Sequence, residues 1–323
     1  MERRRVNDHE LIHRYKMNYG IPLDAPITED MILHHWELEK ELTMQLREST
    51  PDNRWEVFER CYSTLYAKLD WLNLLSGTSE DRRAKNIRAR QDWIPLIGNP
   101  PETICEIGCG KGDFIRYLAE LGFICTGMEI THERGAKWVT PHANLQWRIS
   151  DGVHLDRFEP ENAYDVVISN SVIEHLHPDD LIDHFRGVQF ILRKNGRYIF
   201  VTPHTYQGPS DISKIFNCDR PEGMHLREYT WAELKRSLRK AGFNRVSVPI
   251  RLPYQIRKVL GSRPKTKMAR GYLTYLCILE RMIAVLPNQK LRRRAAQLLM
   301  AIGFPPRIMI VAEKTCESKV TDT

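Results

Sequence analysis

The sequence predicts an α/β fold built on a doubly wound, mainly parallel sheet. Three observations support this prediction. From about residue 99 to residue 250, apolar strand-like runs alternate with segments of helical spacing. A glycine-rich turn directly follows the first of these strands, and a last apolar run, residues 307–313, lies near the carboxyl end. A chain of 323 residues with 42% hydrophobic residues can bury the core that such a sheet needs.

Residues 1–98 are expected to form helices. Thr50 is a suitable N-cap residue, and Pro51 would then occupy the first helical position. Apolar residues at spacings of three and four mark two helical faces, namely Leu38, Leu42 and Leu46, and then Trp55, Phe58, Tyr62, Leu65, Leu69 and Leu72. These helices either pack as a layer on the core domain, close a substrate pocket as a cap, or form a dimer surface, and the sequence does not separate these roles.

The first strand and its turn are the most informative segment. The run TICEI, residues 103–107, carries one acid, Glu106, and is followed by Gly108, Gly110 and Gly112. Helical spacing covers residues 113–121. Glycines at such a turn permit positive φ and a close ligand approach to the main chain. The spacing differs from the dinucleotide fingerprint G-x-G-x-x-G, and this difference argues against an NAD-dependent oxidoreductase.

The remaining elements follow in order. A helix beginning after Thr230 is predicted from its capping box with Glu233, and Gly242 ends that helix. Another helix is expected over residues 180–192. Further strands are expected at residues 123–130, 144–151, 164–169, 197–202 and 245–250. Acids stand at the ends of two of these strands, at Glu129 and Asp151.

The segment TICEIGCGKGDF, together with the ordered acids at later strand ends, resembles class I S-adenosylmethionine-dependent methyltransferases. Its relatives would be bacterial methyltransferases of small molecules and glycans. The resemblance implies a Rossmann-like seven-stranded sheet whose last strand, residues 307–313, inserts antiparallel beside the sixth. It also implies S-adenosylmethionine as the cofactor. The domain is expected to comprise residues 99–250 and 304–316.

The resemblance assigns cofactor-binding roles to residues around the strand ends. Glu129 would hold the ribose, and Asp151 would receive the adenine amino group. The glycine loop and its acid would hold the methionine part. The complete expected set is Glu106, Gly108, Cys109, Gly110, Gly112, Glu129, Ile130, Asp151, Gly152 and Asn170.

Catalytic candidates lie in the loops after the fourth and fifth strands, where such folds bind ligands. A histidine suits a base that takes a hydroxyl proton near neutral pH. The candidates are His175, His204, Tyr206 and His225. The long polar segment between the fifth strand and the next helix is expected to form the acceptor side of the pocket, because loops on a rigid sheet commonly carry function.

The segment SVIEHLHPDD is similar to the E-x-x-E-H metal-binding motif of small-RNA 2′-O-methyltransferases. Ser171 stands where that motif has its first glutamate, while Glu174 and His175 are retained. We therefore expect no metal ion. A metal-dependent RNA 2′-O-methyltransferase and a non-catalytic binding protein with the same fold are kept as alternatives.

Residues 251–303 form a basic insertion that is predicted to contain amphipathic helices. The segment holds twelve Lys or Arg and one acid, Glu280, and so carries +11, whereas the whole chain carries +7. Two helices that cap the site, with basic faces in solvent, would explain the pattern. Peripheral contact with an anionic membrane would also explain it. A nucleic-acid patch is disfavoured because no nucleic-acid-binding motif is recognised.

Composition predicts a cytoplasmic protein. Seven cysteines are scattered without a CxxC pair, and Cys105 and Cys109 are expected to be buried thiols in a reducing compartment. The first ten residues have no apolar region behind them, so no secretory signal is expected. Peripheral contact would place the protein at the inner membrane surface. The expected reaction is methyl transfer to an oxygen of a small molecule, lipid intermediate or sugar, and the oligomeric state is left open.

Overall fold

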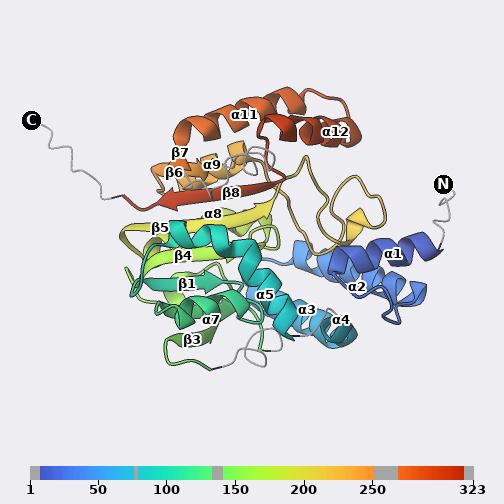
Figure 1. Ribbon diagram of the computed structural model, residues 1–323, viewed down its shortest axis with the longest axis horizontal. Coiled ribbons are helices and arrows are strands. Elements are labelled where there is room, and N and C mark those ends of the chain that lie inside the picture. Colours follow the sequence, from blue (N-terminus) through green and yellow to red (C-terminus); the bar gives the residue numbers. More distant parts are fainter. Residues whose placement is uncertain (1–7, 76–78, 133–140, 251–267, 316–323) are drawn as a thin grey trace, which may run out of the picture.

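The computed structural model describes residues 8–75, 79–132, 141–250 and 268–315. Within these ranges the strands form one sheet in the order β3-β2-β1-β4-β5-β8-β6-β7 (Figure 1). The strands are β1 Thr103–Ile107, β2 Ile124–Glu129, β3 Leu145–Ile149, β4 Tyr164–Asn170, β5 Leu192–Pro203, β6 Arg245–Pro249, β7 Met268–Ala269 and β8 Arg307–Glu313. All seven predicted strands are present, and the two-residue β7 is an additional edge strand.

The chain order of the sheet has the predicted doubly wound form. Neighbours among β1 to β5 pair in parallel, whereas β8 pairs antiparallel with both β5 and β6. The α/β class, the Rossmann-like sheet and the antiparallel last strand are therefore confirmed. Such an order places the carboxyl ends of the parallel strands at one edge, where loops from several strands meet.

Helices cover both faces of the sheet and one of its ends. They are α1 Asp8–Tyr19, α2 Glu29–Glu48, α3 Arg54–Lys68, α4 Asp70–Leu75, α5 Ser79–Arg90, α6 Ile94–Ile97, α7 Asp113–Glu120, α8 Leu181–Ile191, α9 Trp231–Lys240, α11 Arg270–Ala284 and α12 Gln289–Leu299. None of the helices in the described ranges combines the length and apolar character needed to cross a bilayer.

Strand alternation divides the core into two halves. Ile104 and Val166 pack with Phe114 of α7 on one face, whereas Cys105 and Val167 belong to the cluster on the other face, which includes residues of α8, α9 and α11. Successive side chains of a strand point to opposite faces, so these nearly continuous apolar runs are buried on both sides. Cys105 and Cys109 are buried free thiols, as predicted.

The helices α1 to α4 lie at the end of the sheet toward which the arrow of β5 points (Figure 1). The expected leucine face of α2 is buried, and it packs with α3 and with Met224 and Leu226 of the long loop after β5. The N-terminal helices therefore cover the carboxyl ends of the parallel strands, which is the placement expected of a cap.

The predicted cap of α3 is wrong. The helix begins at Arg54 with Asn53 as its N-cap residue, and Thr50 lies in the turn before it. The amide and hydroxyl of Thr50 both donate to Asn53 Oδ1, at 2.9 and 3.3 Å. This local hydrogen bonding competes with helix formation and delays the start of the helix.

The carboxyl-terminal helices α11 and α12 lie above α9, on the side of the sheet away from α7 (Figure 1). They form the described part of the predicted basic insertion, whose residues 251–267 lie outside the described ranges. The capping box of Thr230 and Glu233 at the start of α9 is confirmed. The single acid of the insertion, Glu280, is buried and accepts hydrogen bonds from the amides of Trp231 and Ala232, so it docks α11 onto the start of α9.

Candidate functional site

A cavity of about 610 Å³ lies between the sheet edge and the N-terminal helices. This volume is in the range of small-molecule and cofactor sites. Three parts of the chain line it: the loops that follow β1, β2, β3 and β4; helices α1 to α5; and the long loop after β5. Chain segments more than a hundred residues apart in the sequence thus share one chamber.

The glycine loop forms one wall of the cavity. Gly108, Gly110 and Gly112 have φ values of +67°, +56° and +74°, which glycine adopts without strain. A Cβ atom on Gly108 would lie 2.5 Å from Cγ2 of Val172, so a larger residue there would collide with the loop after β4. Gly112 precedes the first residue of α7, and this arrangement brings the start of that helix to the cavity.

Glu106 lies beneath the glycine loop and is almost completely buried. One of its oxygens, Oε1, pairs with Arg90 at the end of α5, whereas Oε2 has no hydrogen-bond partner among the described residues. Burial raises the pKa of Glu106, and the charge of Arg90 opposes this shift. A buried carboxylate oxygen at a cavity wall calls for a donor, preferably a cationic one.

Glu129 is held against the glycine loop by two backbone amides. Its Oε2 accepts from Gly110 N at 2.8 Å, and its Oε1 accepts from Ile130 N at 2.9 Å. Each carboxylate oxygen can accept a second hydrogen bond. Glu129, Ile130, Cys109 and Gly110 all line the cavity, so the carboxylate is oriented and available to hydroxyl donors.

Asp151 and Gly152 line the cavity after β3, and Asn170 lines it at the end of β4. The carboxylate of Asp151 is strongly engaged, because Oδ1 accepts from the amides of Val153 and His154 and Oδ2 contacts the imidazole of His154 at 2.8 Å. Every residue of the expected cofactor set except Gly112 is a lining residue, and Gly112 completes the turn between lining residues.

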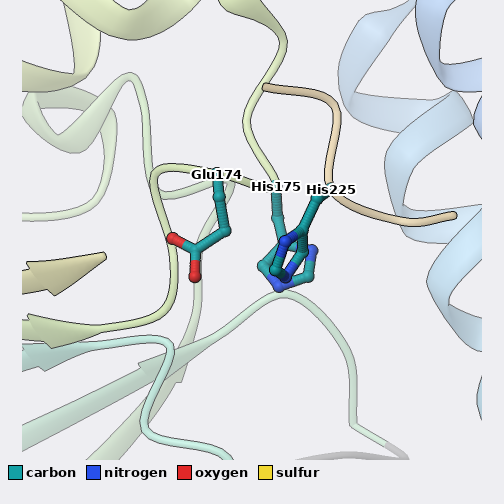
Figure 2. Close-up of side chains that lie close together, drawn as sticks. All are labelled: Glu174, His175 and His225. Atoms are coloured by element: carbon teal, nitrogen blue, oxygen red, sulfur yellow. The ribbon is translucent and has the colours of Figure 1, made fainter. Parts of the chain in front are cut away.

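His175 and His225 face the opposite end of the cavity, and their rings meet edge to face at 4.8 Å between centroids (Figure 2). The Nδ1 atom of His175 donates to the carbonyl of Met224 at 3.0 Å, and the Nδ1 atom of His225 lies 3.0 Å from Glu228 Oε1. Neighbouring carboxylates raise the pKa of His225 against the opposing effect of burial.

His204 and Tyr206 do not line this cavity, and the expectation that they act in catalysis is not retained. His204 is fully buried beside Trp231 and Phe304, where Nε2 donates to Glu280 Oε1 at 2.7 Å and Nδ1 accepts from Tyr206 N. Tyr206 packs against the same cluster. The chain turns away from the cavity after β5, so both residues join α9 to α11.

A cap over the pocket was one of the roles expected for the N-terminal helices, but sequence reasoning did not identify which of their residues line the cavity. His35 and Glu39 of α2 line it and are linked, since Tyr15 Oη lies 2.6 Å from His35 Nδ1 and His35 Nε2 lies 2.7 Å from Glu39 Oε1. Asp211 joins them from the loop after β5. The spacing of four between His35 and Glu39 marks one helix face, but nothing in the sequence shows that this face meets the sheet edge.

Charges of both signs line the cavity, and the carboxylates of Glu106, Asp113, Glu129 and Asp151 accompany the cations at its glycine-loop end. Among the described lining residues, the Lys and Arg side chains are Arg90 and Lys111, and both belong to the glycine-loop end. The other end carries the carboxylates of Glu39 and Asp211 together with histidines. Burial raises the pKa of Asp211, and its oxygens accept from the amides of Ser213 and Gly223.

Comparison with known proteins identifies a family. A family model described as a methyltransferase domain matches residues 79–248, which is more than half of the chain. No curated protein matches the sequence.

Solved structures of methyltransferases are similar to this chain at low sequence identity. A SAM-dependent methyltransferase from Archaeoglobus fulgidus is 17% identical, with 72% of this chain and 94% of that chain covered and a TM-score of 0.49. A putative methyltransferase from an antibiotic biosynthesis pathway of Anabaena variabilis is 20% identical, with 71% and 97% covered and a TM-score of 0.44. Phosphoethanolamine N-methyltransferase 2 of Haemonchus contortus, in complex with S-adenosyl-L-methionine, is 15% identical, with 70% and 53% covered and a TM-score of 0.44.

Proposed function

The chain belongs to the family of methyltransferase domains, and from this premise we propose that it methylates an oxygen of a small-molecule, sugar or lipid-intermediate acceptor. The protein is an enzyme of the S-adenosylmethionine-dependent class, and S-adenosylmethionine is its cofactor. The observation that supports the acceptor proposal is the position of the cations: among the described lining residues, Lys and Arg lie only beside the glycine loop, so the rest of the cavity offers no cation to an anionic acceptor and suits an uncharged polar molecule.

The glycine-loop end fits the cofactor. The unpartnered oxygen of Glu106 would receive the ammonium group, and Arg90 beside it would face the carboxylate of the methionine part. Glu129, oriented by two amides, would accept from the ribose hydroxyls. Asp151 and Gly152 would flank the adenine, with Asp151 using the acceptor capacity that its amide bonds leave.

Methyl transfer from a sulfonium is an in-line displacement, so the chain mainly has to hold the acceptor oxygen behind the methyl carbon. His175 and His225 line the cavity beside α2 and the loop after β5, and we take this part as the acceptor end. We propose that one of these two histidines accepts the proton of the hydroxyl. An imidazole is suited to proton transfer near neutral pH. The cap helices close the chamber over this end and limit the entry of water.

The carboxylates at the acceptor end of the cavity disfavour the binding of a polyanion such as RNA. A nucleic-acid strand is bound largely through Lys and Arg contacts to its phosphates. The described lining residues at this end present Glu39 and Asp211 instead. These observations favour a small polar acceptor over the RNA alternative.

The proposed cofactor site can be tested by replacing Gly110 with arginine. The new side chain would project from a turn with φ of +56° into the wall of the cavity. We expect isothermal titration calorimetry to show at least a hundredfold loss of S-adenosylmethionine affinity.

Gly271→Arg is the matched control, because a side chain at this position on α11 meets no other atom within 4 Å. The control should bind the cofactor normally, and circular dichroism should show that both variants are folded. Normal affinity in folded Gly110→Arg would refute the proposed site.

We further propose that α11 and α12 contact an anionic membrane surface. Large apolar side chains are exposed on and just after these helices, among them Met282 at 63%, Val285 at 81% and Leu298 at 77% exposure. Arg281 and Lys290 are exposed on the same pair of helices. Exposed apolar residues mixed with cations are typical of helices that lie in a membrane interface, and such contact would bring a lipid-linked acceptor to the enzyme.

A further inference from the structure

Three potential metal ligands converge at the wall of the cavity, where His175 and His225 line it and Glu174 is buried beside them. Glu174 and His175 follow β4, and His225 lies in the segment before α9, fifty residues later (Figure 2). One ligand atom from each of the three residues lies within 4.8 Å of the others. Three atoms bound to one ion at about 2.1 Å lie roughly 3.0–3.6 Å from one another, so binding would require the cluster to contract by about 1 Å.

Both imidazoles are oriented through their Nδ1 atoms. A carbonyl oxygen can only accept, so His175 donates through Nδ1 to Met224, and its neutral form carries the lone pair on Nε2. Glu228 holds His225 through Nδ1 in the same way, and Glu228 is itself fixed by the amide of Ser210 at 2.7 Å. Imidazoles that ligate metals are typically held by a carboxylate or carbonyl at the opposite nitrogen.

A second observation, apart from the clustering of the three residues, is the environment of the Glu174 carboxylate. Its side chain is completely buried, and Oε2 accepts from Thr202 Oγ1 at 3.0 Å, whereas Oε1 has no hydrogen-bond partner among the described residues. A buried carboxylate oxygen without a partner is costly unless a proton or a cation satisfies it. The nearby carboxylates of Asp211 and Glu228 add to the negative charge that surrounds the histidine pair.

We propose that Glu174, His175 and His225 form a divalent-cation site at the acceptor end of the methyl-transfer cavity. Two imidazoles and one carboxylate suit first-row divalent ions such as Mn²⁺, Fe²⁺, Co²⁺ and Zn²⁺. Three protein ligands leave coordination positions for oxygen atoms from the cavity.

The role of the ion in catalysis rests on the proposed function, whereas its binding does not. A cation at this place would bind an acceptor hydroxyl and lower the pKa of that hydroxyl, which makes loss of the proton easier. With the cation bound, the two histidines would act as its ligands and not as bases, and the proton of the hydroxyl would pass to water in the cavity. Ser171, where the related motif has glutamate, led us to expect no metal, but the fold supplies His225 as a third ligand from a distant segment.

The site can be tested with Co²⁺ as the probe and the full chain stripped by chelator. We expect one Co²⁺ per chain, with a visible absorption spectrum of nitrogen and oxygen ligation. Glu174→Gln and His225→Gln should each weaken binding at least fiftyfold in calorimetry. His177→Gln is the matched control, because His177 lies on the same loop but outside the cluster, with its Nδ1 accepting from Asp179 N.

Absence of Co²⁺ and Mn²⁺ binding to folded wild-type protein at millimolar metal would overturn the site. Unchanged binding in both ligand variants would overturn it as well, as would equal loss in the control. The proposed function is tested separately by titrating the metal-free protein with S-adenosylmethionine. The cofactor site does not include Glu174, His175 or His225, so cofactor binding should not depend on the metal. Failure of cofactor binding would count against the function, and failure of Co²⁺ binding alone would count only against the metal site.

Discussion

At the scale of single residues, Glu106 and Glu174 have the same unusual environment. Each is buried, and each has one oxygen without a hydrogen-bond partner among the described residues. Desolvation raises the pKa of both carboxyls. Glu106 lines the cavity beside the glycine loop, whereas Glu174 lies beside the histidine pair and is not itself a lining residue. Their orphaned oxygens therefore indicate where cationic groups are expected to bind.

His184 connects the loop of Gly152, which lines the cavity, to the core. Its Nδ1 donates to the carbonyl of Gly152, its Nε2 accepts from Tyr198 Oη at 3.0 Å, and Tyr198 Oη also lies 2.6 Å from Ser169 Oγ. The ring is completely buried, and desolvation lowers its pKa to about 4. The neutral imidazole therefore holds the loop of Gly152 in place.

This environment predicts that acid destabilises the protein through His184. The folded-state pKa lies below the usual value of 6.5, so the unfolded chain binds the proton more tightly. The stabilisation is complete above about pH 6.5 and is lost as the pH falls toward 4, by up to about 3 kcal/mol.

Urea unfolding at pH 7, 6, 5 and 4.5 measures this effect. The free energy of unfolding should fall less steeply with acidification in His184→Gln than in the wild type. His142→Gln, a change in a loop outside the core clusters, should retain the wild-type dependence. Equal pH dependence in the wild type and His184→Gln would show that another group controls acid stability.

At the scale of elements, the packing of α11 on α9 depends on one carboxylate. Glu280 caps the start of α9 through two backbone amides and accepts from His204 Nε2. This arrangement explains why the otherwise basic segment retains one acid. It also explains why His204, expected in the active site, has a structural position instead.

Replacement of Glu280 by alanine should lower the free energy of unfolding by about 2–4 kcal/mol, because three buried donors would lose their acceptor. Cofactor affinity should remain within twofold of the wild type, since Glu280 lies outside the cavity. Chemical denaturation and calorimetry measure the two quantities.

Asp183→Ala on α8 is the control for Glu280→Ala, because Asp183 is an exposed residue paired with Arg186 at the surface. It should change the stability by less than about 0.5 kcal/mol. A comparably small loss in Glu280→Ala would contradict the proposed role of the carboxylate in docking α11.

At the scale of the whole molecule, the N-terminal helices that line the cavity and the exposed helices α11 and α12 lie in different parts of the structure (Figure 1). The chamber lies between the sheet edge and the cap, whereas α11 and α12 cover α9. Membrane contact through these two helices would therefore leave the cap and the cofactor site free to act.

Vesicle flotation tests this arrangement. The wild type should float with vesicles containing about 30% anionic lipid at low salt, and Val285→Glu combined with Leu298→Glu should reduce the bound fraction at least fivefold. The matched control combines Leu121→Glu with Met44→Glu, which add the same charge at exposed positions on other surfaces.

Salt provides a second measurement of membrane contact. Raising the ionic strength to 0.5 M should release most of the wild-type protein, because screening weakens the attraction between cations and anionic lipid. Equal flotation of both double variants, or no flotation of the wild type, would exclude membrane contact through α11 and α12.

The features that could be predicted from the sequence depend on residues that are close together in the chain. The glycine loop, the strands and the capping box at Thr230 are encoded by neighbouring residues, and the structure contains all of them. The cap of α3 was predicted at the wrong residue, because the competing bonds of Asn53 depend on the turn geometry. His175 and His225 were both candidates, but their meeting with Glu174 requires the loop after β4 and the segment before α9 to fold together.

By itself, the sequence determined the sheet, the cofactor turn and the methyltransferase family, because periodicity and glycine spacing act within one or two consecutive elements. The tertiary structure alone decided which polar residues share the chamber, since those contacts join chain segments 50 to about 185 residues apart. It moved His204 to a structural position, brought His35 and Glu39 to the acceptor end, and left one oxygen of Glu174 without a partner. Burial and hydrogen-bond satisfaction, which decide these roles, are properties of the packed chain.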